Sequence, residues 1–221
     1  MHSGKTIAVF DLDKTITKSD TYVPFLLRIL LHNPRRVLVL PKLSFAVARY
    51  MLGLRDNSWL KEEFLRGLAS NMRRSEIADM GEKFVQKLLG GGLILDALAR
   101  IEHHRQCGHV LILATASVDL YAKLIGKRLG FDTVVCTLTE WSDDDRLTGN
   151  LASQNCYGPR KKERIANILQ EFGVFDELVV YSDHHSDLPL MELADAAVSV
   201  NPTRTLRKVS EENQFTIQLW R

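Results

Sequence analysis

The chain has 221 residues, which is enough for one α/β domain with an insertion or for two small domains. Apolar residues make up 45% of it and charged residues 25%, as in ordinary globular proteins. The formal net charge is only +2, so the composition excludes a general nucleic-acid-binding protein. The three cysteines form no CxxC pair, which predicts reduced thiols in a cytoplasmic protein.

The first predicted element is a short apolar strand, Thr6–Phe10. From about Lys18 to Leu89 the chain then shows successive helical patterns without a strong strand signal, and Gly90-Gly91-Gly92 marks a flexible return. The simplest interpretation is an α-helical insertion, residues 18–90, that forms a cap over the active site. The core domain would then combine residues 1–17 and 91–221.

After the insertion, helical and apolar strand-like segments alternate. They are, in chain order, a helix over Leu93–Arg105, a strand over Val110–Ala114, a helix over Asp119–Leu129, a weaker strand over Thr133–Thr139, a helix over Lys161–Phe172, strands over Leu178–Tyr181 and Ala196–Val200, and an edge strand within Phe215–Trp220. Continuous apolar strands are typical of parallel sheets that are covered on both faces. The sequence therefore predicts an α/β fold, a doubly wound parallel sheet with an inserted helical cap.

Basic residues are concentrated in the predicted cap. The segment from Lys18 to Arg74 holds eleven lysines and arginines against four acidic residues, which gives it a charge of +7. Because the whole chain carries +2, the rest of it carries −5. A basic cap over an acidic core favours an anionic substrate.

Polar side chains follow the predicted strands at the points where these end. Asp11 and Asp13 come directly after the first strand, Thr115 follows the second, and Asp183 follows the Leu178–Tyr181 strand. Ligands of open α/β sheets bind at this edge. Clustered carboxylates repel one another unless a cation lies between them, and oxygen ligands suit Mg²⁺. A nucleophile, a metal, a proton donor and positive charge are what phosphoryl transfer requires.

Four motifs in this order resemble those of the haloacid dehalogenase (HAD) superfamily, in its phosphoserine-phosphatase-like branch with a helical cap after the first motif. The motifs are Asp11-Leu12-Asp13-Lys14-Thr15, Ala114-Thr115-Ala116-Ser117, Gly158 with Lys161, and Asp183-His184-His185-Ser186-Asp187. A single DxD sequence is weak support, whereas all four motifs in order are specific. The similarity extends over nearly the whole chain.

The resemblance implies catalytic roles for three residues. Asp11 would attack phosphorus and become the aspartyl phosphate, and Asp13 would protonate the leaving oxygen and later deprotonate the hydrolytic water. Lys161 would offset the charge of Asp11 and of the bound phosphate. These roles describe a Mg²⁺-dependent phosphomonoester hydrolase.

The resemblance also implies roles in binding. Thr115 would hold the phosphoryl group through its hydroxyl, with help from the backbone N–H of Ala116. Asp183 would ligate Mg²⁺ together with Asp11 and the backbone carbonyl of Asp13. Asp187 would support the site by orienting Lys161 or a metal-bound water.

The substrate is less clear from the sequence than the reaction. Asp20 stands where phosphoserine phosphatases carry a glutamate that helps to bind the substrate amine, so a small phosphoserine-like metabolite is one candidate without being favoured. The apolar, arginine-containing stretches Tyr22–Leu31 and Val37–Leu54 favour packing within the cap as the first interpretation. The alternative is peripheral contact with an anionic membrane at its inner face, where the substrate would be a lipid phosphate such as phosphatidylglycerol phosphate.

Two further functions remain alternatives. The aspartyl phosphate could transfer its phosphoryl group to an alcohol, which would make the protein a phosphotransferase. The chain could instead be a basic binding module on an inactive HAD scaffold. The carboxylates at Asp11, Asp13 and Asp183 argue against the second alternative, because a scaffold has no use for unpaired carboxylates.

Overall fold

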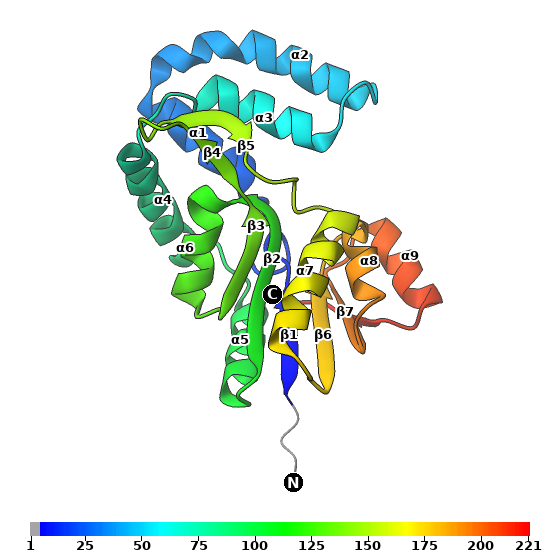
Figure 1. Ribbon diagram of the computed structural model, residues 1–221. Coiled ribbons are helices and arrows are strands. Elements are labelled where there is room, and N and C mark those ends of the chain that lie inside the picture. Colours follow the sequence, from blue (N-terminus) through cyan, green and yellow to red (C-terminus); the bar gives the residue numbers. More distant parts are fainter. Residues whose placement is uncertain (1–4) are drawn as a thin grey trace.

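A six-stranded parallel sheet forms the centre of the molecule (Figure 1). The computed structural model describes residues 5–221, so residues 1–4 of the predicted core segment lie outside it. The strands are, in spatial order, β3 (Thr133–Thr137), β2 (Val110–Val118), β1 (Thr6–Phe10), β6 (Glu177–Ser182), β7 (Ala196–Val200) and β8 (Thr216–Gln218). β1 therefore lies between β2 and β6, where the chain order of the strands reverses.

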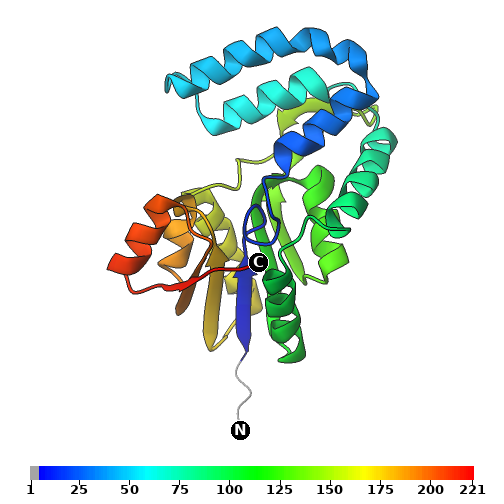
Figure 2. The same cartoon turned by 180° about the vertical axis from the view of Figure 1, so that it is seen from behind.

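Helices cover both faces of this sheet. Residues such as Phe10 and Leu113 point into one apolar cluster together with α5 (Leu95–Gln106) and α6 (Asp119–Leu129). Alternate residues of the same strands point into a second cluster that packs against α7 (Pro159–Phe172), α8 (Leu188–Met191) and α9 (Arg204–Glu212). Figure 2 shows the arrangement from behind. The predicted doubly wound parallel sheet is confirmed, and the continuous burial of β1 explains why its sequence is apolar throughout.

Three of the predicted strands have different bounds in the structure. β6 extends the predicted strand Leu178–Tyr181 by one residue at each end. β2 continues beyond Ala114 to Val118, and its register against β3 shifts between these two residues. The predicted strand Thr133–Thr139 is two elements, because β3 ends at Thr137 and β4 (Thr139–Trp141) starts a separate hairpin with β5 (Leu147–Leu151). This hairpin was not predicted from the sequence.

Helices follow β1 throughout the predicted cap region. They are α1 (Tyr22–His32), the 3₁₀ helix η1 (Pro34–Val39), α2 (Leu40–Met51), α3 (Asn57–Leu68) and α4 (Arg74–Leu89). Local sequence explains their starts: the Asp56 carboxylate accepts the Trp59 backbone N–H at 2.8 Å, and the Glu76 side chain accepts the Arg73 N–H at 2.8 Å. Figure 1 shows α2 and α3 beyond the carboxyl ends of the sheet strands. The domain boundary at residues 18–90 stays a prediction.

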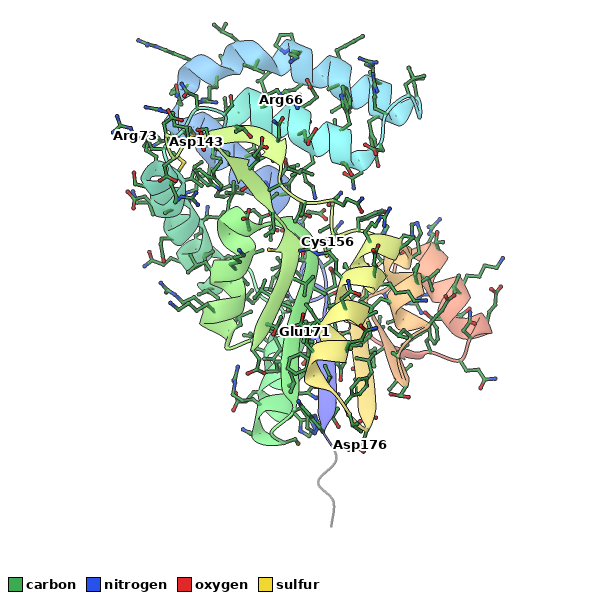
Figure 3. All side chains as sticks on the ribbon, in the orientation of Figure 1. Arg66, Arg73, Asp143, Cys156, Glu171 and Asp176 are labelled. Carbon is green, nitrogen blue, oxygen red and sulfur yellow. The ribbon has the colours of Figure 1, made fainter. Side chains whose placement is uncertain are left out.

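The hairpin β4–β5 joins these helices from a distant part of the sequence. The backbone N–H of Asn71 donates to the Leu147 carbonyl at 2.7 Å, and the Leu147 N–H donates to the Met72 carbonyl at 3.0 Å. The Leu151 N–H donates to the Glu62 carboxylate on α3 at 3.1 Å. Figure 3 labels Arg66 of α3 above the hairpin, where its guanidinium donates to the Asn150 side chain at 3.0 Å.

None of the helices within residues 5–221 combines the length and the apolar character that a membrane span requires.

Candidate active site

The carboxyl ends of β2, β1 and β6 open into one cavity of about 240 Å³. Asp11 follows β1 directly and Asp183 follows β6 directly, and these two strands are paired up to Phe10 and Tyr181. The residues that line the cavity are Asp11, Asp13, Lys14, Asp20, Asn57, Ala116, Tyr157, Lys161, Asp183, His184, Ser186 and Asp187. Four separate segments of the chain thus bring the residues of the sequence motifs together.

Lys161 forms the centre of a buried charged cluster. Its ammonium donates to the Asp11 carboxylate at 2.7 Å and to the Asp187 carboxylate at 2.8 Å. Gly158 has a backbone φ of 58°, which favours glycine, and it starts α7 so that Lys161 lies in the first turn. The Ser182 hydroxyl also donates to Asp187, at 2.7 Å. Asp187 therefore holds Lys161 against Asp11, although its other carboxylate oxygen has no hydrogen-bond partner within residues 5–221.

The charged groups around the Asp11 carboxylate are more negative than positive. Burial raises the pKa of the Asp11 carboxyl well above its usual value, and the Lys161 ammonium lowers it only in part. The carboxylates of Asp187, Asp183 and Asp13 raise it further. One ammonium does not balance this many carboxylates, so the cluster can accept another cation.

Asp13 lies in a cage of hydroxyl groups. One of its oxygens accepts the Thr21 backbone N–H and the Thr21 hydroxyl, both at 2.7 Å, and the other accepts the Ser117 hydroxyl at 2.9 Å. The Tyr121 hydroxyl donates in turn to Ser117 at 2.9 Å. Burial raises the pKa of the Asp13 carboxyl, and the hydrogen bonds from Thr21 and Ser117 oppose this rise. A carboxyl group with a raised pKa in a fixed orientation suits the transfer of protons.

The donor set around the cavity fits Mg²⁺. Burial and the charge of Asp187 raise the pKa of the Asp183 carboxyl to about 7, which shows that its ionised form lacks a sufficient partner. Within residues 5–221 no three His, Cys, Asp or Glu side chains form a metal cluster. The predicted ligands require only two carboxylate side chains, those of Asp11 and Asp183, together with the Asp13 carbonyl. Such hard oxygen ligands suit an ion that keeps several of its waters.

The predicted phosphate-binding residues lie at the bulged end of β2. Ala116 lines the cavity, whereas Thr115 is fully buried and its hydroxyl accepts the Ser117 backbone N–H at 3.0 Å. The Thr115 hydroxyl thus stabilises the backbone at the end of β2 through its hydrogen bond with Ser117. Its direct contact with phosphate stays a prediction.

Sequence reasoning missed Lys61, which reaches the same loop from α3. Its side chain is buried, and the ammonium donates to the Ala116 carbonyl and, at 2.8 Å, to the Asn155 side chain. The Thr137 hydroxyl donates to the same carbonyl at 2.9 Å. Burial lowers the pKa of Lys61 to about 8. A lysine on a predicted helix is normally solvated, so no signal in the sequence distinguished this one.

A wider cleft of about 770 Å³ adjoins the cavity and shares Asn57 and Tyr157 with it. Its walls come from the start of α3 and from the segment that connects β5 with α7. Most of its lining residues are polar: Asp56, Asn57, Ser58, Glu62, Ser153, Gln154, Asn155, Tyr157 and Arg160. A phosphate at Asp11 would therefore leave the rest of its substrate among hydrogen-bonding groups.

The Asp20 carboxylate at the cavity is already paired. It contacts the Lys14 ammonium at 2.7 Å, and the side chains of Lys14 and Asp20 are 50% and 63% exposed. Lys14 itself has a φ of 60° in the loop after β1. Because Lys14 neutralises Asp20, this carboxylate is a weaker partner for a substrate amine than an unpaired one.

Comparisons with known proteins agree with this geometry. The family model of haloacid dehalogenase-like hydrolases matches residues 8–192. A probable phosphatase of Mycobacterium tuberculosis is 29% identical over 212 residues, which is 93% of this chain and 72% of the relative. A Bordetella pertussis protein of unknown function has the same fold with a TM-score of 0.85 and 23% identity, over 97% of this chain and 98% of that one.

A probable phosphoserine phosphatase from Vibrio cholerae also shares the fold, with a TM-score of 0.74 and 15% identity over 98% of this chain and 61% of that one. The matched family model includes all four motifs and the whole helical region between the first and the second. The chain therefore belongs to the haloacid dehalogenase-like hydrolases.

Proposed function

We propose that this protein is a Mg²⁺-dependent phosphomonoesterase that works through an aspartyl phosphate on Asp11. The observation that carries the proposal is the buried cluster of Lys161 between Asp11 and Asp187, with Asp13 and Asp183 at the same cavity. A structural ion pair would need one carboxylate for one ammonium, whereas this cluster holds an excess of carboxylates. A bound Mg²⁺ would supply positive charge at the phosphoryl oxygens.

The chain's own residues support two displacements at phosphorus. In the first, an Asp11 oxygen forms a bond to phosphorus while the bond to the leaving oxygen breaks, and Asp13 gives its proton to that oxygen. In the second, Asp13 takes a proton from water, whose oxygen bonds to phosphorus as the bond to Asp11 breaks. Lys161 stays protonated throughout, because its two carboxylate partners raise its pKa against the effect of burial. The hydrogen bonds from Thr21 and Ser117 hold Asp13 in place for both proton transfers.

The polar cleft supports a small phosphomonoester with a polar leaving group as the substrate. Phosphoserine-like metabolites meet this description, although the pairing of Asp20 with Lys14 speaks against strong binding of an amine at that position. In a lipid phosphate, only the polar head group would enter the cleft. The cytoplasmic setting stays a prediction.

Substitution of the nucleophile tests the proposal. We expect Asp11→Asn to abolish phosphate release from a panel of phosphorylated metabolites while the fold is retained, because an amide oxygen is a poor nucleophile. Chelation of divalent ions should stop the wild-type enzyme, and added Mg²⁺ should restore it. The matched control is Asp176→Asn, an exposed aspartate near the opposite end of the sheet (Figure 3). Normal turnover by Asp11→Asn would refute the assignment.

The same assay separates the alternatives. Added glycerol or ethanol would yield a phosphorylated alcohol if the enzyme were a phosphotransferase. A wild-type protein that binds phosphoesters but releases no phosphate with Mg²⁺ present would instead be a binding module on a HAD scaffold.

A further inference from the structure

The outermost helix of the molecule exposes apolar side chains to solvent. Leu38 of η1, Phe45 of α2 and Leu52 just after α2 are 83%, 66% and 73% exposed, and they recur every seven residues, or about two helical turns. Leu54 follows in the next loop at 63% exposure. We call these four residues the outer cap face. Figures 1 and 2 show α2 on the side of α3 that faces away from the sheet.

Packing inside the protein does not account for this face. Leu43 and Ala46 are the buried residues of α2, and they lie on the side of the helix opposite Phe45 and Leu52. α2 packs mainly against α3 and η1. One apolar side of α2 is therefore covered by the protein, and a second apolar side is exposed to solvent. A contiguous exposed apolar patch that is rimmed by polar residues is typical of an interaction site.

Positive charge is concentrated in the segment of the chain that carries the outer cap face. Residues 21–55 contain no aspartate or glutamate, and they hold six cationic side chains: Arg28, Arg35, Arg36, Lys42, Arg49 and Arg55. The Lys42 side chain is 65% exposed although it contacts Glu63 of α3 at 3.1 Å. Arg49 and Arg55 lie over the Trp59 ring. A partner that covers this face must offer both an apolar environment and negative charge.

Other occupants satisfy only part of this requirement. A second copy of the chain in a two-fold dimer would place two basic surfaces against each other, which costs free energy. Nucleic acid supplies negative charge but gives Leu38, Phe45 and Leu52 no apolar environment. A bilayer with anionic lipid supplies both, because an amphipathic helix lies in the plane of the interface with its apolar residues below the head groups and its cations among them.

We propose that the outer cap face docks the protein on the surface of an anionic lipid bilayer. The loop after α2 connects this face to the substrate cleft: Leu52 and Leu54 belong to the face, whereas Asp56 and Asn57 line the cleft. Docking would thus place the mouth of the cleft close to the lipid surface. This inference goes beyond the proposed chemistry and does not depend on it.

Co-sedimentation with vesicles tests the docking directly. The wild-type protein should sediment with vesicles of phosphatidylcholine and phosphatidylglycerol at low salt and stay in the supernatant with phosphatidylcholine alone. The double substitution Phe45→Ser with Leu52→Ser should weaken binding by roughly tenfold or more, because both side chains lose their burial in the bilayer. Neutralising Arg55 and Lys42 to glutamine should cost about fivefold per charge at low salt and little at high salt.

The matched control is the double substitution Leu95→Ser with Val174→Ser. These two apolar residues lie in the predicted core domain, far from the outer cap face in the sequence, and they are 70% and 93% exposed. This variant should bind vesicles like the wild type. All variants should keep the circular dichroism spectrum and the basal hydrolysis of a soluble phosphoester, so that a failure of docking is distinct from a failure of the proposed chemistry. Absence of wild-type binding to anionic vesicles would overturn the inference. So would a wild-type dimer in light scattering that Phe45→Ser with Leu52→Ser converts to monomer without any vesicle binding.

Discussion

At the scale of single residues, Lys61 connects the helical region to the chemistry. It is the buried cation of α3, and its ammonium holds the carbonyl of Ala116 at the end of β2. The backbone of this loop faces the position that the phosphate would take. A charge-assisted hydrogen bond to the carbonyl fixes the loop more firmly than a neutral one would. Lys61 is therefore a positioning residue, because it acts through Ala116.

We expect the activity to fall as the pH rises through about 8. The pKa of Lys61 is about 8 in the folded protein, because burial disfavours its charged form. Deprotonation above this pH weakens the hold on Ala116. Lys61→Met should lower kcat/KM by up to about a hundredfold at neutral pH and remove this alkaline decline. Lys61→Arg, which stays charged, should restore part of the activity without the decline.

A pH profile of kcat/KM for the three proteins checks this prediction. An unchanged alkaline decline in Lys61→Met would assign the titration to another group and contradict the role given to Lys61.

The motif residues were predictable, whereas their supports were not. Asp11, Asp13, Lys161, Asp183 and Asp187 line one cavity, as the four motifs in order suggested. The partners of Asp13, Thr21 and Ser117, come from the start of α1 and the end of β2, which only the folded chain brings together. Burial of a polar side chain depends on tertiary packing, so the sequence alone carries no signal for Lys61.

At the scale of elements, the hairpin β4–β5 fixes α3 over the core. Gly149 of β5 lies so close to α3 that a Cβ atom there would come within 2.5 Å of the Arg66 Cα atom. The hairpin was missed in the sequence because its strands have three and five residues and contain mostly polar or small side chains. These two strands form a two-stranded sheet that packs against α3, so neither shows the continuous apolar pattern of a buried strand.

Gly149→Ala should lower the free energy of unfolding by more than Gly108→Ala does. Both glycines have a positive φ, +91° and +72°, so both substitutions carry a backbone cost of about 1 kcal/mol. An added Cβ at Gly108 meets no atom of the described part of the chain within 4 Å, whereas at Gly149 it collides with the backbone of α3. The extra cost at Gly149 should be about 1–3 kcal/mol.

Urea unfolding of the two variants measures this difference. Equal losses of stability would mean that α3 shifts freely away from the hairpin, contrary to the close packing described here.

At the scale of the whole molecule, the sheet places an excess of negative charge at one edge. The pKa of Asp183 is about 7 in the folded chain without metal, against a model-compound value of 3.8. At a pH between these two pKa values, the Asp183 carboxyl is protonated in the folded protein and ionised in the unfolded chain. Its stability without metal should therefore fall as the pH rises through this window, by about 1.4 kcal/mol per pH unit.

Mg²⁺ should stabilise the protein more at about pH 8 than at about pH 5, because it binds the ionised carboxylates and competes with protons. Thermal unfolding with Mg²⁺ and with chelator at both pH values gives the two shifts in Tm. In Asp183→Asn the Mg²⁺-dependent shift should be largely lost and the pH dependence reduced. A Mg²⁺ effect that is equal at both pH values, or retained in Asp183→Asn, would contradict the proposed ligand set.

The bounds of the sheet strands could be predicted from the sequence where successive residues of a strand are buried. β1 and β7 have the predicted bounds, because strands covered on both faces are almost entirely apolar. β2 extends beyond its predicted end. Its last residues include the polar Thr115 and Ser117, which are buried with their side chains in hydrogen bonds, so the apolar pattern that predicts a buried strand stops before them. The apolar stretches Tyr22–Leu31 and Val37–Leu54, the second of which contains Phe45 and Leu52, were predicted first to pack within the cap, with contact with lipid as the alternative. The structure leaves these two side chains unpacked.

Trapping of the phosphorylated enzyme tests the central claim most directly. The wild-type protein would be mixed with a substrate and Mg²⁺, quenched in acid within the first turnover, digested and analysed by mass spectrometry. We expect the mass of one phosphoryl group on the peptide that contains Asp11, and no such addition in Asp11→Asn. Rapid turnover without any phosphorylated peptide, or with the phosphoryl group on another residue, would contradict Asp11 as the nucleophile.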